Sequence, residues 1–267
     1  MKLKEFEYGD ITLKYVYLPS KQAVNDKMVV VLSNPLERNG TVEFMNSLAR
    51  FKNVPRLFIA AARDYQFGFY LVKDKTYILR DAVEALIEKF RMELDVSKNN
   101  TYLIGFCLAS FPVVNIAINM GYNGIITEFN AVGGALHRLM PSSVQDDYHL
   151  RHQASREPHM DFTFEEFTEN RAKYSGLDDD ETTEFKSVFF DYVSKNQPQK
   201  LVIPKFYFLA GKNEESWVYC GKETCEKFEE LKINYELTVN DADYDHMSAV
   251  PYFIEYFTNL LYRLGMS

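Results

Sequence analysis

Hydrophobic residues fall along the chain in short segments whose patterns predict strands. Residues 11 to 18 alternate between apolar and polar types, which is typical of a strand with one buried face, and we expect it to pair antiparallel. Met28 to Ser33 and Leu57 to Ala62 are continuous apolar runs, as in strands that are buried on both faces. Further short runs of strand type cover Tyr102–Phe106, Gly124–Phe129, Lys205–Ala210 and Tyr235–Val239.

Helical periodicity occurs between several of these strands and after the last one. Tyr77 to Phe90 has apolar residues at helical spacing, and a final amphipathic helix is expected over Val250 to Leu264. Strands that alternate with helices predict a mostly parallel sheet with crossover helices, which is the α/β class.

Residues 140–199 differ from the rest of the chain. They are rich in charged residues, contain no strand-like run, and combine helical stretches with acidic turns. We therefore expect a helical insertion in an α/β core formed by residues 1–139 and 200–267. Its position between two sheet strands favours a lid over an active site, and the alternative is a solvated flap that stabilises the sheet edge.

Composition narrows the class of protein. The 267 residues are 46% hydrophobic, and the net charge of −8 does not favour nucleic-acid binding, because no basic surplus meets the phosphates. The first residues lack the apolar region of a signal peptide, and no apolar run is long enough to span a membrane. The three cysteines suit a reducing, cytoplasmic compartment, and Cys220 and Cys225 have a poor spacing for a metal site, so we expect reduced helix residues and no metal.

The most informative chemistry lies in residues 101–121, which read TYLIGFCLASFPVVNIAINMG. Cys107 stands at a turn between a strand and a helix, with Gly105 two residues before it and the small Ala109 two residues after it. This is the spacing of a nucleophile elbow, in which small residues let the strand and the helix pass closely. The adjacent helix N-terminus would lower the pKa of the thiol. The alternative is a structural cysteine buried in the core.

A nucleophile needs a base, and the base needs an acid that orients it. His246 lies in the loop between the last strand and the last helix, where such a base is expected. Glu214, three residues after Gly211, is the expected acid, with Glu215 as the nearest competitor and Asn213 as a neutral alternative.

An oxyanion hole needs two N–H donors that point at the developing negative charge. The backbone of Leu108, which follows the nucleophile, would provide one donor. The second is expected in the loop after the strand that starts at Met28, at Ser33 or Asn34, because Pro35 has no N–H.

Four stretches together resemble the α/β-hydrolase superfamily: VVVLSNP, YLIGFCLAS, FLAGKNEES and DADYDHMSAV. Within it, they look like a branch of capsular-polysaccharide O-acetyltransferases and accessory-secretion proteins, and the G-F-C start also resembles dienelactone-hydrolase-like enzymes. The pattern covers about residues 28 to 264. Cys107 replaces the usual Ser, Leu108 to Ser110 replace Lys-Gly-Gly, and Glu214 replaces the more usual Asp.

This resemblance implies acyl transfer through a thioester on Cys107, with a sugar hydroxyl or water as acceptor. Acetyl-CoA is the implied acyl donor, a polysaccharide is the implied acceptor, and no tightly bound cofactor is expected. Because the elbow departs from the pattern, a second reading is a non-catalytic subunit in the export of surface glycans or glycoproteins.

Overall fold

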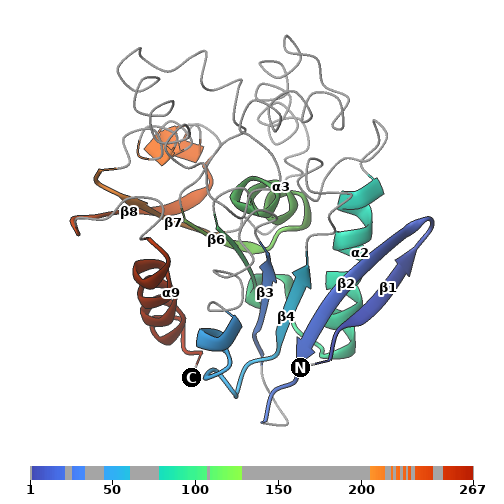
Figure 1. The fold of residues 1–267 in the computed structure, drawn as a ribbon. Helices are drawn as coiled ribbons and strands as arrows, with labels where there is room; N and C mark the ends of the chain where they lie inside the picture. Colours follow the sequence, from blue (N-terminus) through green and yellow to red (C-terminus); the bar gives the residue numbers. More distant parts are fainter. Residues whose placement is uncertain are drawn as a thin grey trace, which may run out of the picture.

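The structure, a computed structural model, describes residues 2–21, 26–33, 45–60, 78–106, 109–127, 205–213, 232–242 and 249–266. It also describes helical residues 218, 221, 222, 225, 226, 228 and 229. In these parts of the chain, helices flank one central sheet (Figure 1).

The sheet has eight strands in the order β1-β2-β4-β3-β5-β6-β7-β8. From β4 to β8 in this order, all neighbouring strands are parallel, whereas β2 pairs antiparallel with both β1 and β4. The strands are β1 (Lys4–Tyr8), β2 (Ile11–Leu18), β3 (Met28–Leu32), β4 (Arg56–Ala60), β5 (Thr101–Phe106), β6 (Asn123–Thr127), β7 (Lys205–Gly211) and β8 (Asn234–Asn240).

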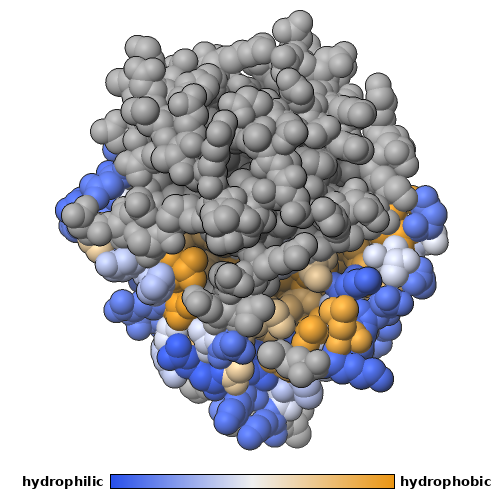
Figure 2. Space-filling view, in the orientation of Figure 1, coloured by the Kyte–Doolittle hydropathy of each residue, from blue (hydrophilic) through white to orange (hydrophobic). Residues whose placement is uncertain are grey.

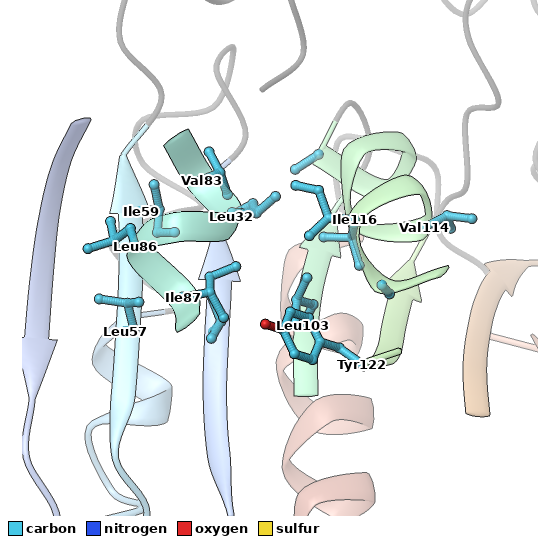
Figure 3. Close-up of a cluster of buried hydrophobic side chains, with 14 of the residues drawn as sticks. Leu32, Leu57, Ile59, Val83, Leu86, Ile87, Leu103, Val114, Ile116 and Tyr122 are labelled. Carbon is cyan, nitrogen blue, oxygen red and sulfur yellow. The ribbon is translucent and has the colours of Figure 1, made fainter. Parts of the chain in front are cut away.

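Helices cover both faces of this sheet. The helices α2 (Ile78–Glu93) and α3 (Ser110–Met120) lie on one face, and α9 (Val250–Arg263) lies on the other; a short 3-10 helix, η2 (Lys98–Asn100), leads into β5 (Figure 1). Alternate strand residues therefore enter two separate cores. Leu103 packs with α2 and α3, while its neighbours Tyr102 and Ile104 pack with α9. Figure 3 shows the first core, in which Leu86 and Ile87 of α2 lie near Leu57 and Leu103 of the strands.

The period of hydrophobicity explains why these segments form strands. All five residues of β3 are buried, which requires apolar side chains on both faces and fits its MVVVL sequence. In contrast, β1 has the sequence KEFEY, and none of its residues is fully buried.

The predicted fold class is confirmed, and the predicted strands and helices appear with small shifts at their ends. Sequence analysis missed β1, because its charged residues carry no apolar signal and its pairing with β2 through Gly9, at φ +58°, determines its conformation. The expected helical insertion, residues 140–199, lies outside the described residues and stays a prediction.

Polar and apolar residues are mixed on the described surface. None of the described helices is long and apolar enough to cross a bilayer. Figure 2 shows hydrophilic residues over most of the described surface, with hydrophobic residues in separate areas. The large exposed apolar side chains are Leu3, Tyr8, Met92, Val239 and Tyr262, which belong to opposite edges of the sheet and to both helical layers.

A buried arginine fixes the amino end of the sheet. Arg56, the first residue of β4, is only 4% exposed. Its Nη1 donates to the carbonyl oxygens of Leu48 and Ala49, each at 3.1 Å, and its Nη2 donates to that of Pro19 at 3.2 Å. Burial lowers the pKa of Arg56, so these carbonyl dipoles must replace the water that the cation has lost.

We expect Arg56→Lys to lower the free energy of unfolding by about 2 kcal/mol, because a single ammonium group cannot reproduce the planar fork of donors. Urea denaturation followed by circular dichroism measures this loss. Arg50→Lys is the matched control: Arg50 also donates to a carbonyl oxygen, that of Ser47, but in an exposed position. Equal losses of unfolding free energy in the two variants would contradict a special role for the hydrogen bonds of the buried Arg56.

Candidate functional site

The predicted site residues all follow carboxyl ends of parallel strands. Cys107 comes directly after β5, Asn34 two residues after β3, Glu214 three residues after Gly211, and His246 six residues after Asn240. Parallel strands place their carboxyl ends at one edge of a sheet, so the strand ends that precede these residues share that edge. Cys107, Leu108, Asn34, Glu214 and His246 themselves, with the competitor Glu215, lie outside the described residues.

The turn after β5 has the close packing of an elbow. A Cβ atom at Gly105 would lie 2.5 Å from the carbonyl oxygen of Ala109 and 2.8 Å from Cγ2 of Val113. No side chain fits there, so glycine is required where the strand passes behind the helix. Ala109 is fully buried, with φ −76° and ψ −11°. Its methyl group is therefore accommodated at a position where the family that this sequence resembles has glycine.

A buried hydrogen bond holds the start of α3 against β6. Ser110 Oγ donates to the carbonyl oxygen of Thr127 at 2.8 Å, and both residues are fully buried. Thr127 is the last residue of β6 and lies in register with Phe106, which immediately precedes Cys107. The hydroxyl group of Thr127 has no hydrogen-bond partner in the described part of the chain.

An aromatic contact joins the strand before Cys107 to the helix after His246. The rings of Phe106 and Phe253 have their centroids 4.8 Å apart, and Phe253 and Ala249 are buried in the core beside α9. The helix that follows His246 in the sequence therefore packs against the strand that precedes Cys107.

The loops after β7 and β8 also start side by side. The N–H of Lys212 donates to the carbonyl oxygen of Asn240 at 3.0 Å. Asn240 Oδ1 in turn accepts from the N–H of Ala242 at 2.8 Å, which turns the chain at the end of β8. These contacts bring the two loops together two residues before Glu214 and four residues before His246.

Ser33 is the one predicted oxyanion residue within the described chain. Its N–H donates to the carbonyl oxygen of Ile59 at 3.1 Å and so extends the pairing of β3 with β4. This bond leaves Asn34 as the remaining predicted donor in that loop.

The acidic residues of α2 whose pKa values are shifted form hydrogen bonds that stabilise the packing of the helices, and they are not among the candidate site residues. Burial raises the pKa of Glu84, which accepts a hydrogen bond from Asn119 Nδ2 at 2.7 Å. Burial would also raise the pKa of Glu88, but hydrogen bonds from Arg91 and Tyr122 lower it. These pairs connect α2 with α3 and with the chain just beyond it.

No three described His, Cys, Asp or Glu side chains come together in the way that a metal ion requires. Cys225 is free, helical and buried, as expected for it. Cys220 lies outside the described residues.

Known proteins match this chain by structure. No family model and no curated protein matches its sequence. The capsule O-acetyltransferase of Neisseria meningitidis serogroup A is 16% identical, with a TM-score of 0.58, and the match covers 97% of this chain and 94% of that one. A mutant of that enzyme, solved in complex with CoA, matches with a TM-score of 0.61 and 15% identity over the same shares.

Two further structures of similar fold belong to proteins with other names. The Glycosylation Associate Protein complex of Streptococcus agalactiae gives a TM-score of 0.62 at 10% identity, over 97% of this chain and 46% of that one. The S-formylglutathione hydrolase of Staphylococcus aureus gives 0.57 at 12% identity, over 96% and 97%. Together with the strand order, these matches show that the chain has the α/β-hydrolase fold.

Sequence analysis did not find the roles of Ser110 and Thr127. A serine after a predicted elbow reads as an ordinary first residue of a helix, and nothing in its spacing shows that the hydroxyl reaches the next strand. The threonine ends an apolar run and carries no motif.

We expect Gly105→Ala to lower the free energy of unfolding by about 3 kcal/mol, because the new methyl group meets the backbone of Ala109, which cannot move without shifting α3. Gly221→Ala is the control. A Cβ there would meet Leu237 Cδ1 at 3.5 Å, an ordinary contact, and helix propensity favours alanine. Thermal unfolding compares the two variants, and a Gly105→Ala protein as stable as wild type would refute the close approach.

We expect Cys225 to react more slowly with iodoacetamide at pH 7.5 than Cys107. Burial raises the pKa of Cys225 to about 12, with Glu229 and Glu226 adding to the shift, so almost no thiolate forms at this pH. Mass spectrometry of timed digests measures both rates. Faster labelling of Cys225 would remove the main support for an activated thiol at the elbow.

Proposed function

We propose that this protein is an acyl-transfer enzyme that works through a thioester on Cys107, either as an O-acyltransferase, with acetyl as the acyl group, or as an esterase. The observation that supports the proposal is the close approach of β5 and α3 at Gly105, directly before and after the short segment that contains Cys107, which is the packing that a nucleophile elbow requires.

The chemistry follows from the residue types. The Cys107 thiol gives its proton to His246, and the thiolate attacks the carbonyl carbon of the acyl donor. The tetrahedral intermediate collapses to a thioester, and the leaving group takes the proton from His246. A sugar hydroxyl or a water molecule then gives its proton to His246 and attacks the thioester, which releases the acylated product and the Cys107 thiol.

Two N–H groups would stabilise the negative oxygen of each intermediate. The backbone of Leu108, which directly follows Cys107 in the sequence, would be one, and that of Asn34 would be the other, because the N–H of Ser33 already bonds within the sheet. Glu214 would orient His246, with Glu215, Asn213 or Asp243 as alternatives in the same two loops.

Acetyl-CoA is the proposed acyl donor, with a glycan as acceptor. A capsule O-acetyltransferase has the same fold over nearly the whole chain, and one structure of its mutant contains CoA. Residues 140–199 would form the lid, and a reducing cytoplasm would keep the thiol reduced. Ester hydrolysis is the same chemistry with water as acceptor, as in the hydrolase of similar fold.

A non-catalytic role in the export of surface glycoproteins is the second candidate. It is favoured by the similarity to the Glycosylation Associate Protein complex and by the altered residues after Cys107. The packing of Ala109 argues against an elbow that is inactive for steric reasons, because Ala109 is buried with helical backbone angles and the lack of a side chain at Gly105 allows its backbone to approach the strand.

The test is hydrolysis of p-nitrophenyl acetate together with intact-mass detection of acetyl-Cys107. We expect Cys107→Ala and His246→Ala to reduce kcat/KM by at least about a thousandfold, as is typical when one member of such a unit is removed. Glu214→Gln should reduce it much more than Glu215→Gln, since only one of two adjacent side chains can point at His246.

Circular dichroism must show that each variant is folded. Release of free CoA from acetyl-CoA only when a glycan is added would identify a transferase. A wild-type protein that is never acetylated on Cys107 would instead favour the non-catalytic role, and equal effects at Glu214 and Glu215 would refute the assignment of the acid.

A further inference from the structure

The side chain of Ser110, the first residue of α3, bonds outside its own helix. The N-cap position, from which a serine hydroxyl would accept a hydrogen bond from a free backbone N–H, is occupied by Ala109. Here the hydroxyl of Ser110 donates across to β6, to the carbonyl oxygen of Thr127 at 2.8 Å. The preceding Ala109 makes no side-chain cap, and the first turn of α3 contains no acidic residue.

Two contacts therefore fix the elbow on either side of Cys107. Gly105, two residues before it, lies against the backbone of Ala109. Ser110, three residues after it, is tied to the end of β6 in a fully buried position. The first contact sets the distance between strand and helix, and the second stops the helix from sliding along the strand.

Few charged side chains surround the N-terminus of α3, so the effect of this helix end on a nearby charge depends on where the helix lies. The sequences of α3, β3 and β6 contain no acidic, basic or histidine residue, and the ionisable residues of β5 and β7 lie in their amino-terminal halves. Lys212 and Asp241 follow the ends of β7 and β8, and Glu255 on α9 is exposed. α2 also touches α3 and carries acidic residues, but Glu84 accepts a hydrogen bond from Asn119, next to the last residue of α3, and Glu88 bonds to Tyr122 beyond that helix. The first turn of α3 itself contains no acidic residue that would offset the partial positive charge of its N-terminus.

We infer that Ser110 is a positioning residue for Cys107: its bond to Thr127 holds the N-terminus of α3 where it acts on the sulfur atom. The inference rests on the proposed function only in taking Cys107 as the nucleophile. Without the bond, the first turn of α3 can shift, and both the favourable field at the sulfur and the Leu108 N–H move away from the reacting atoms.

The experiment measures the rate of Cys107 alkylation by iodoacetamide between pH 6 and 10, in the intact chain, by mass spectrometry. In Ser110→Ala we expect the rate at pH 7 to fall by about tenfold, the size of effect that a helix N-terminus has on a nearby charge. At pH 10 the rates of variant and wild type should converge, because the thiol is then ionised in both.

Thr101→Val is the matched control. Thr101 is also fully buried, and its Oγ1 donates to the carbonyl oxygen of Ser97 at 3.0 Å, at the opposite end of β5. We expect this variant to lose thermal stability as Ser110→Ala does, but to keep the wild-type alkylation profile. Ser110→Thr, which retains the hydroxyl, should stay within threefold of wild type and serves if Ser110→Ala does not fold.

An unchanged profile in folded Ser110→Ala would overturn the inference, as would an equal change in Thr101→Val or a folded Ser110→Thr with a rate as low as that expected for Ser110→Ala. These outcomes do not depend on ester turnover. A protein that alkylates as expected but never transfers an acyl group would refute the proposed function and leave the role of Ser110 standing.

Discussion

The parallel direction of β3, β5, β6, β7 and β8 is the constraint on which the candidate site depends. Cys107 and His246 are separated by more than half of the chain, and a sheet that brings every strand back in the same direction places the ends of β5 and β8, which precede them, at one edge. That direction is in turn maintained by burial, because each central strand must hide apolar side chains on two faces. The hydrophobic effect is not specific for any reaction, but by burying these strands it brings their carboxyl ends to one edge of the sheet.

Close packing at the elbow illustrates how stability and function share the same contacts. Gly105 brings strand and helix together at the cost of backbone freedom, which is greatest for glycine in the unfolded chain. The hydroxyl group of Ser110 bonds to β6, and the N-cap residue of α3 is Ala109, which has no side-chain acceptor. The preference for a polar N-cap residue is not followed at this point, and such exceptions concentrate where a fold carries a site.

The sequence was most informative where burial determines conformation. Strands such as β3 and β7 can be predicted because nearly every residue in them is apolar. The elbow can be predicted because a tight turn between a strand and a helix requires small residues at fixed spacing. It was uninformative for β1, whose polar residues form a strand only by pairing with β2. The bond from Ser110 to Thr127 was equally hidden, since it depends on which strand lies next to β5 and not on any local pattern. The choice of Glu214 over Glu215 rests on its spacing from Gly211 alone, because the side-chain directions of two adjacent residues in a loop are not encoded in a local pattern.

The contact between Phe106 and Phe253 has a consequence for the order in which the protein becomes active. During synthesis, β5 and α3 leave the ribosome long before α9, so the elbow exists for some time without the helix that completes its second core. Until α9 packs, Phe106 and the apolar face of β5 around Ile104 have no cover from that helix. With the roles proposed for Cys107 and His246, the thiol would be separated in time from its base, and the chain would become a catalyst only in its final folding step.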